Sequence, residues 1–355
     1  MHHSFLAIQR ARLSRLFSDI QGQSFSNPKL ETHVEELAAL FRSVEKQIDV
    51  SAKKDIVDKD EFGHFNDIID FLLSNIEYLE DSVIDTIPFE TIFCLETALK
   101  DWIKEQYIIV VTFKRGEYFF SSVLSSDGNY NYIENRYGVK LTYKLIQISI
   151  PKYEVNDYLF NVVLYHELGH FVDIKYKVSS KISDGNYAHL TDDERSVVKS
   201  HYAEFFSDIF AAQYISRYSS VYLDYFAGDN PDSHSHPSTV ARSKVVDDFL
   251  NGNPNPIIQL IKQTTLLSAK TEIGIKYEPF DTKDIISLAP AEIERQAQLH
   301  YVFVAGWELW LNEKDKFPVK NNAKLYKIIN NLLEKTISNY MVKSVWDAAN
   351  LPGQE

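Results

Sequence analysis

Most of the chain has apolar residues spaced three and four positions apart, a pattern typical of helices that bury one face. Residues 1–105 show it in the segments 34–41 and 65–79, and residues 257–355 show it again. Residues 107–150 differ, because the segments 107–113, 118–124 and 141–150 are rich in β-forming residues. We therefore expect an α+β protein that is mostly helical and has one small sheet.

Two local breaks divide this pattern. Lys114–Glu117, between the first two β-rich segments, has the composition of a hairpin turn. The run N-G-N-P-N-P at residues 251–256 separates the middle of the chain from its C-terminal part. We expect a helical N-terminal region at 1–105, a central region at 106–252 and a helical C-terminal region at 253–355. In the central region, 106–150 would form an antiparallel or mixed sheet and 151–252 would form helices.

The most informative motif lies in those central helices. Residues 166–170 read H-E-L-G-H, which is the pattern H-E-x-x-H. Asn156 or Asp157 can cap a helix start. Apolar residues near it recur at helical spacing from residue 155 onward, which predicts that the motif is helical. Positions i and i+4 of a helix lie about 40° apart, so His166 and His170 can direct both imidazoles at one metal ion.

Glu167 gives the motif its expected chemistry. It stands one position along the helix from His166 and can flank a bound ion without ligating it. Zinc lowers the pKa of a bound water, and a neighbouring carboxylate can take its proton and later deliver it to a leaving amine. Gly169 would allow another backbone to approach the helix closely.

A catalytic zinc site needs a third protein ligand, which we expect on a second helix. Thr191 and Glu194 form the pattern T-x-x-E, a capping box that predicts a helix start. Glu204 and Asp208 follow one turn apart among aromatic residues, where an unpaired charge would be unfavourable. We assign Glu204 as third ligand and Asp208 as acceptor of the free ring N–H of His166. The alternative is a solvent-exposed face that carries two acids.

Three other residues are rival ligands for the same position. His201 precedes Glu204 by three residues and could share its face, so it is the strongest rival. Asp173 lies three residues beyond His170, and Glu194 lies at the start of the second helix. Each has a donor atom that zinc accepts.

The two motifs together resemble the gluzincin metallopeptidases, in which H-E-x-x-H is followed by E-x-x-x-D. Residues 236–242 read H-P-S-T-V-A-R and are similar to the H-P-x-x-x-x-R segment of the M48 (HtpX-like) family. The resemblance covers about residues 155–250. It implies that His236 binds the oxyanion of the tetrahedral intermediate, and that Arg242 supports the site or binds a substrate carbonyl. His234 could take the place of His236, and Ser238 could simply cap a following helix.

The chain differs from the M48 family in its lack of long apolar runs, and it also resembles a second group of peptidases. M48 enzymes usually carry transmembrane helices, whereas no apolar run here approaches the ~20 residues needed to cross a bilayer. Intracellular peptidases of the ImmA/IrrE type also carry H-E-L-G-H, and their glutamate helix continues much like Phe210-Ala211-Ala212. Those proteins cleave repressors, so the second resemblance implies site-specific or regulatory cleavage.

Composition limits the partners. The formal net charge of −13 argues against a nucleic-acid backbone as ligand. The N-terminal residues lack the apolar core of a signal peptide, and the single cysteine, Cys94, agrees with a reducing compartment. We therefore expect a cytoplasmic protein without a membrane span. Its oligomeric state is left open.

These observations predict a zincin-like, zinc-dependent endopeptidase that acts on a protein or peptide substrate, with Glu167 as general base. We expect the sheet to lie beside the metal helix, where a strand edge can hold an extended peptide through main-chain hydrogen bonds. Two other functions fit the same residues. One is a regulatory or binding protein of zincin fold with little turnover, and the other is a zinc hydrolase of a non-peptide amide.

Overall fold

The chain forms two compact units, which divide the expected central region between them. The first unit combines Met1–Ile87 with Ile103–Lys152, and the second combines Pro88–Trp102 with Tyr153–Glu355. The strands therefore group with the N-terminal helices, whereas the H-E-x-x-H segment groups with the C-terminal helices. This computed structural model describes residues 2–25, 27–51, 59–81, 89–113, 119–122, 127–151, 154 and 156–349.

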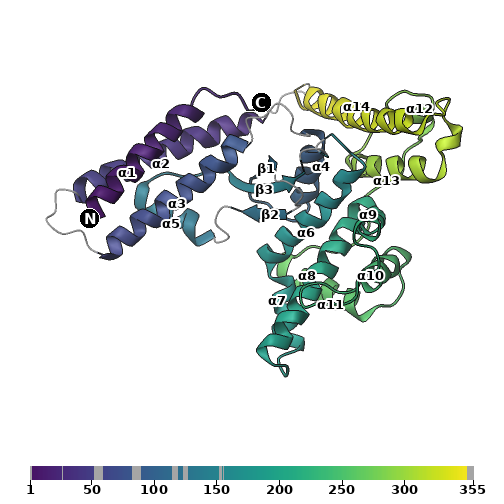
Figure 1. Ribbon diagram of the computed structural model, residues 1–355, viewed down its shortest axis with the longest axis horizontal. Helices are drawn as coiled ribbons and strands as arrows, with labels where there is room; N and C mark the ends of the chain where they lie inside the picture. Colours follow the sequence, from purple (N-terminus) through teal and green to yellow (C-terminus); the bar gives the residue numbers. More distant parts are fainter. Residues whose placement is uncertain are drawn as a thin grey trace, which may run out of the picture. The chain divides into compact units, whose positions relative to one another are not determined.

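The first unit is a group of helices with the small sheet (Figure 1). Its elements are α1 (His2–Ile20), α2 (Pro28–Ser51), α3 (Lys59–Asp81), β1 (Tyr107–Phe113), β2 (Phe119–Ser122), α5 (Asp127–Tyr137) and β3 (Lys144–Ile150). Helices α1, α2 and α3 pack against one another, and α3 also contacts β1 and β3. Leu30, Leu37 and Val44 recur along α2 and are buried in the common core, as the apolar spacing predicts.

The sheet is mixed, with strand order β1-β3-β2. β1 and β3 are parallel, so a purely antiparallel sheet is excluded, while β2 runs antiparallel to β3. The predicted hairpin between the first two strands is wrong, because β3 lies between them. Every residue of β3 after Lys144 is buried, as suits a central strand. The predicted turn, residues 114–117, lies outside the described residues.

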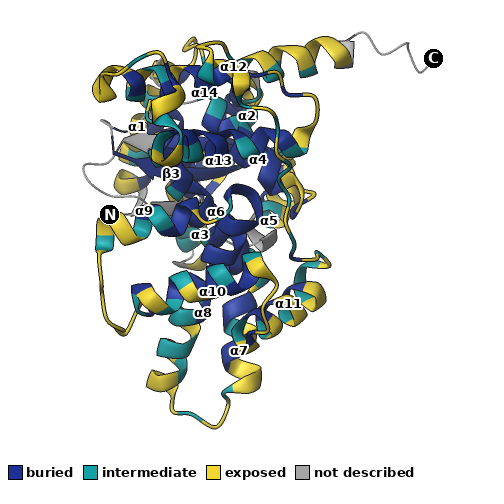
Figure 2. Cartoon of the chain, turned by 90° about the vertical axis from the view of Figure 1, so that its right-hand side faces the viewer, coloured by how far each residue is buried: buried dark blue, intermediate teal, exposed yellow. Residues whose placement is uncertain are grey.

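The second unit is helical in its described part. Its elements are α4 (Phe89–Lys100), the 3-10 helix Phe160–Val162, α6 (Val163–Tyr176), α7 (Val178–Asn186), α8 (Asp192–Ile215), α9 (Tyr218–Ala227), α10 (Thr239–Asn251), α11 (Pro256–Ala269), α12 (Lys283–Ile286), α13 (Gln296–Asn312), the 3-10 helix Lys314–Lys316 and α14 (Asn322–Ala349). In Figure 2, α6 and α13 are largely buried, whereas α11 and α12 carry wide exposed faces. The expectation of a mostly helical chain is confirmed.

Helix α8 is the centre of this unit and contacts α6, α7, α9, α10 and α13. Its sequence explains both its start and its position. Thr191 and Glu194 form the predicted capping box, and the second half of the helix is buried. The indole of Trp102 packs on Phe206 with ring centroids 5.9 Å apart and donates to the Tyr214 hydroxyl at 2.9 Å. These contacts tie segment 88–102 to the second unit, although it lies before the strands in sequence.

The close approach of α6 to α8 requires Gly169. A Cβ atom at that position would lie 2.7 Å from the Ser207 Cα and 3.2 Å from the Phe210 Cβ. Real Cβ atoms do not approach a neighbouring backbone this closely, so any larger residue would push the two helices apart. The glycine of H-E-L-G-H therefore serves helix packing, and the neighbouring backbone is that of the helix that carries Glu204.

The start of the motif helix differs from its predicted position. We expected a cap at Asn156 or Asp157, whereas α6 begins at Val163. The Asp157 carbonyl accepts the N–H groups of Phe160 and Asn161 at 3.1 and 3.0 Å, just before the short 3-10 helix Phe160–Val162. Val162 and Val163 of the apolar stripe thus lie in two helical segments of different winding.

No helix within the described part of the chain is long and apolar enough to cross a membrane. The sheet belongs to the first unit, so its expected position beside the motif helix stays a prediction.

Candidate metal centre

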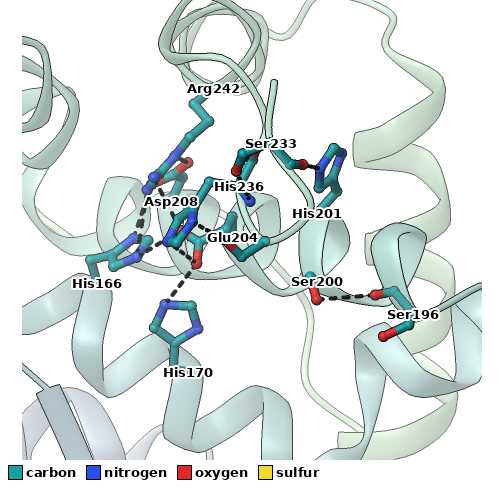
Figure 3. A network of polar contacts seen from close by, with 11 residues as sticks. His166, His170, Ser196, Ser200, His201, Glu204, Asp208, Ser233, His236 and Arg242 are labelled. Carbon is teal, nitrogen blue, oxygen red and sulfur yellow. Dashed lines mark hydrogen bonds and ion pairs between the residues drawn. The ribbon is translucent and has the colours of Figure 1, made fainter. Parts of the chain in front are cut away.

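His166, His170 and Glu204 form a compact group of metal-binding donors. His166 and His170 are one turn apart on α6, and their rings are perpendicular with centroids 4.6 Å apart. Glu204 reaches them from α8, with its carboxylate oxygens 3.4 Å from His166 Nε2 and 3.5 Å from His170 Nε2. One donor atom from each residue lies within 4.8 Å of the other two. Figure 3 shows both imidazoles directed at this carboxylate.

These distances fit a bound metal ion. Ligands about 2.0–2.1 Å from a tetrahedral zinc ion are separated from one another by roughly 3.3–3.4 Å. The contacts of Glu204 with the two imidazoles have similar lengths, 3.4 Å from Oε2 to His166 and 3.5 Å from Oε1 to His170, and each uses a different oxygen. His166 and Glu204 are buried and His170 is partly buried, so the donors are held by packing rather than by solvent-exposed rotamers. The group can therefore hold a metal ion.

A buried ion pair lies behind this group. The Arg242 guanidinium donates to both oxygens of Asp208, through Nε and Nη2, at 2.7 Å each. Its Nη1 atom lies 3.1 Å from Glu204 Oε2. His166 Nδ1 lies 2.9 Å from Asp208 Oδ1, although the angle is outside that of a regular hydrogen bond. Asp208 and Arg242 thus orient a histidine and the glutamate, as expected for residues behind a metal site.

The electrostatics of the group separate the two histidines. Burial opposes a charge on His166, but the carboxylates of Asp208 and Glu204 outweigh it and raise its pKa to about 9. Burial and the neighbouring His166 cation lower the pKa of His170 to about 4. Burial would raise the pKa of Glu204, yet its hydrogen bond with His166 and the nearby positive charges lower it to about 2. Burial raises the pKa of Glu167.

The group opens into a pocket of about 530 Å³. Glu167 and His236 line it together with the three donors. His236 Nε2 lies 3.5 Å from Glu204 Oε1, and its side chain is 57% exposed. Sequence reasoning did not identify the apolar part of the wall, which comes from α6, α9 and the segment between α9 and α10. This part comprises Val163, Leu223, Ala227, Pro231 and Pro237. The prolines that flank S-H-S-H were the only sequence signal for it.

His201 and Glu194, two of the rival ligands, lie outside the donor group. His201 Nε2 donates to the Ser233 carbonyl at 2.7 Å and points away from Glu204 in Figure 3. Glu194 accepts from the backbone N–H of Thr191 at 2.9 Å in the capping box. Each side chain therefore has a structural partner of its own.

Asp173, the third rival ligand, and His234, the alternative to His236, also lie outside the donor group. Asp173 is buried and accepts the N–H and hydroxyl of Ser179 at 2.7 and 2.6 Å, at the junction of α6 and α7. His234 is exposed and does not line the pocket, unlike His236. Ser238 does cap α10, as the simpler interpretation of the H-P-x-x-x-x-R segment predicted. The capping role of Ser238 is therefore confirmed, while the oxyanion role of His236 stays a prediction.

Comparison with known proteins found no match among family models, curated proteins or solved structures.

Proposed function

We propose that this chain is a zinc-dependent endopeptidase with Glu167 as general base. The observation that carries the proposal is the grouping of His166, His170 and Glu204 around one point, with Glu167 on the same pocket. Two imidazoles and one carboxylate are typical of catalytic zinc sites, because three protein ligands leave a fourth position open. A zinc ion held there would acidify a water molecule and polarise a substrate carbonyl.

Glu167 is suited to moving a proton in both directions. Its carboxylate shares the pocket with the donors but does not belong to their group. Burial raises its pKa, and a general base that must later act as an acid works best when its pKa is close to the working pH. In the proposed reaction, Glu167 takes the proton of the attacking water and delivers it to the leaving amine.

His236 and Arg242 have different roles in this proposal. His236 lines the pocket beside Glu204, where its imidazole can donate a hydrogen bond to the oxyanion. Arg242 is committed to Asp208 and Glu204 through three short contacts. We therefore assign Arg242 to support of the site rather than to the substrate carbonyl.

The shape of the pocket supports a polypeptide substrate. Its apolar wall lies beside the donor group and can accept one amino-acid side chain next to the bond that is cut. The resemblance to ImmA/IrrE-type and M48 peptidases agrees with this substrate class. Site-specific or regulatory cleavage is the form of the activity that we propose by that analogy.

The decisive experiment compares Glu167→Gln with the wild type on zinc-loaded protein. We expect Glu167→Gln to lose hydrolysis of a peptide library by at least about 10²-fold, because the base is removed. Zinc content should stay near one per chain, because Glu167 is not among the three donors. Asp184→Asn is the matched control, since Asp184 is an exposed carboxylate on α7 that does not line the pocket.

Three outcomes would contradict the proposal in different ways. Wild-type activity in Glu167→Gln would remove Glu167 from the mechanism. Full zinc content in Glu204→Ala would remove Glu204 from the ligand set. A wild-type protein that binds zinc and cleaves no peptide would favour a non-peptide amide substrate or a binding role.

A further inference from the structure

The segment that connects α9 to α10, residues 228–238, forms one wall of the pocket and carries His236. Its tip is a turn closed on itself. The Ser233 N–H donates to the His236 carbonyl at 2.8 Å, and the His236 N–H donates to Ser233 Oγ at 2.9 Å. At its base, the Ser238 N–H donates to Asp232 Oδ1 at 2.6 Å. Residues 233–236, the tip, therefore form one local unit that includes His236.

His201 of α8 contacts the backbone of this tip. His201 Nε2 lies 2.7 Å from the Ser233 carbonyl oxygen. Among the hydrogen bonds between described residues, this is the only one that joins the tip to α8, and the 3.5 Å contact of His236 Nε2 with Glu204 Oε1 is a second link between them. His201 precedes Glu204 by three residues, so the helix that supplies a metal donor also holds the loop that supplies His236. In Figure 3, His201 contacts the tip at Ser233, and Glu204 lies beside His236.

The chemistry of this contact is defined by the carbonyl. A carbonyl oxygen only accepts, so His201 must donate its Nε2–H. The neutral Nε2–H tautomer and the imidazolium both do this, so the contact does not depend on the charge of the ring. The other contact of the His236 ring within the loop is between Nδ1 and Ser235 Oγ, at 2.7 Å, inside the same tip. The ring thus contacts Ser235 within the tip and Glu204 on α8, so a displaced tip shifts the ring relative to Glu204.

We infer that His201 is a positioning residue: its bond to Ser233 fixes the tip, and through it the imidazole of His236, over the candidate metal centre. The catalytic part of this inference rests on the proposed function. The mechanical part does not, because it depends only on contacts between α8 and the tip. A group that stabilises an oxyanion must be held closely in place, since a displacement of about 1 Å can reduce the rate by about 10²-fold.

The first test measures the loop without any substrate. Amide hydrogen exchange is followed at Ser233 and His236 in the full, zinc-loaded chain. We expect His201→Leu, which removes the donor, to speed exchange by about two- to tenfold, the range for loss of one partly exposed hydrogen bond. His201→Gln keeps an N–H donor at similar reach and should restore most of the protection.

The matched control is Ser200→Ala. Ser200 is next to His201, and its hydroxyl donates to the Ser196 carbonyl within α8, at 3.0 Å (Figure 3). This variant should leave exchange at the tip unchanged.

The second test measures turnover of a quenched fluorescent peptide library. We expect His201→Leu to lower kcat by about two- to tenfold while KM and zinc content stay at the wild-type level. In a His236→Phe background the same change should have no further effect, because both residues act through one imidazole.

The outcomes separate the inference from the proposed function. Unchanged exchange at the tip in His201→Leu would overturn the inference. Faster exchange with an unchanged kcat would overturn the positioning role. A wild type without peptidase activity would overturn the proposed function alone, and the exchange experiment would still decide whether His201 holds the tip.

Discussion

His166 and His170 lie one helical turn apart, and their pKa values are shifted in opposite directions. The pKa of His166 is raised to about 9 because Asp208 and Glu204 favour its charge, while the pKa of His170 is lowered to about 4 by burial. At neutral pH the metal-free group therefore carries one imidazolium. Metal ions bind only the neutral imidazole, so binding must release this proton.

Metal affinity should consequently depend on pH. Between pH 6 and 8, below the pKa of His166 and above that of His170, one proton competes with the ion. We expect the apparent zinc affinity to rise about tenfold per pH unit over this window. Competition with a chelator of known pH dependence measures it, and calorimetry in buffers of different ionisation enthalpy should show release of about one proton. An affinity that does not change with pH would contradict the assignment of His166.

The two loop histidines provide a second test at this scale. His236→Phe should reduce kcat by about 10²–10³-fold if its imidazole binds the oxyanion. Zinc content should stay at the wild-type level, because His236 is not among the three donors. His234→Phe is the control, since His234 lies two residues away, is exposed and does not line the pocket. Equal rates in both variants would assign His236 a structural role only.

At the scale of elements, the candidate site depends on the distance between α6 and α8. Gly169 allows that distance, because a Cβ there would lie 2.7 Å from the Ser207 backbone. The packing that brings His170 and Glu204 together is therefore encoded inside the H-E-x-x-H motif itself. Gly169 packs against Ser207 and Phe210 of α8, and His166 and His170 contact Glu204 and Asp208 of the same helix.

Gly169→Ala should separate the two helices. We expect a loss of about 1–3 kcal/mol in the free energy of unfolding, as for other overpacked interfaces, together with weaker zinc binding. Gly185→Ala is the control, because a Cβ at Gly185 on α7 meets no atom within 4 Å. That variant should be neutral or slightly stabilising. Denaturant unfolding and zinc titration measure both effects, and equal stability of the two variants would contradict the packing role of Gly169.

At the scale of the whole molecule, the division into two units separates the candidate site from the sheet. The three donors and the described pocket residues all belong to the second unit. The first unit has its own apolar core, which includes α1, α2 and α3. A bound ion should therefore stabilise the second unit in particular.

Hydrogen exchange with and without zinc tests this expectation. At a free zinc concentration about 100-fold above Kd, binding stabilises the folded state by about 2.7 kcal/mol. The slowest amides of α6 and α8 should then exchange about 100-fold more slowly. Amides of α2 and α3 serve as the internal reference and should not change. Equal slowing in both units would show that they unfold together.

Local signals in the sequence predicted much of the second unit. The capping box at Thr191 begins α8 as predicted, since both of its bonds form within one turn. The side chains of Glu204 and Asp208 both face the motif helix, as their spacing indicated. The pairing of the strands could not be predicted in this way. β3 separates β1 from β2, and the order of strands depends on contacts distant in sequence.

The sequence by itself determined which residue types are available and which share a helix face, because helical spacing is a local property. Tertiary structure alone decided which of the nearby acids and histidines meet. Glu204 faces His166 and His170, while His201, on the same helix, holds Ser233. The reason is that a difference of three residues turns a side chain by about 60° around the helix, and only the packing of α8 against its neighbours defines what lies in each direction.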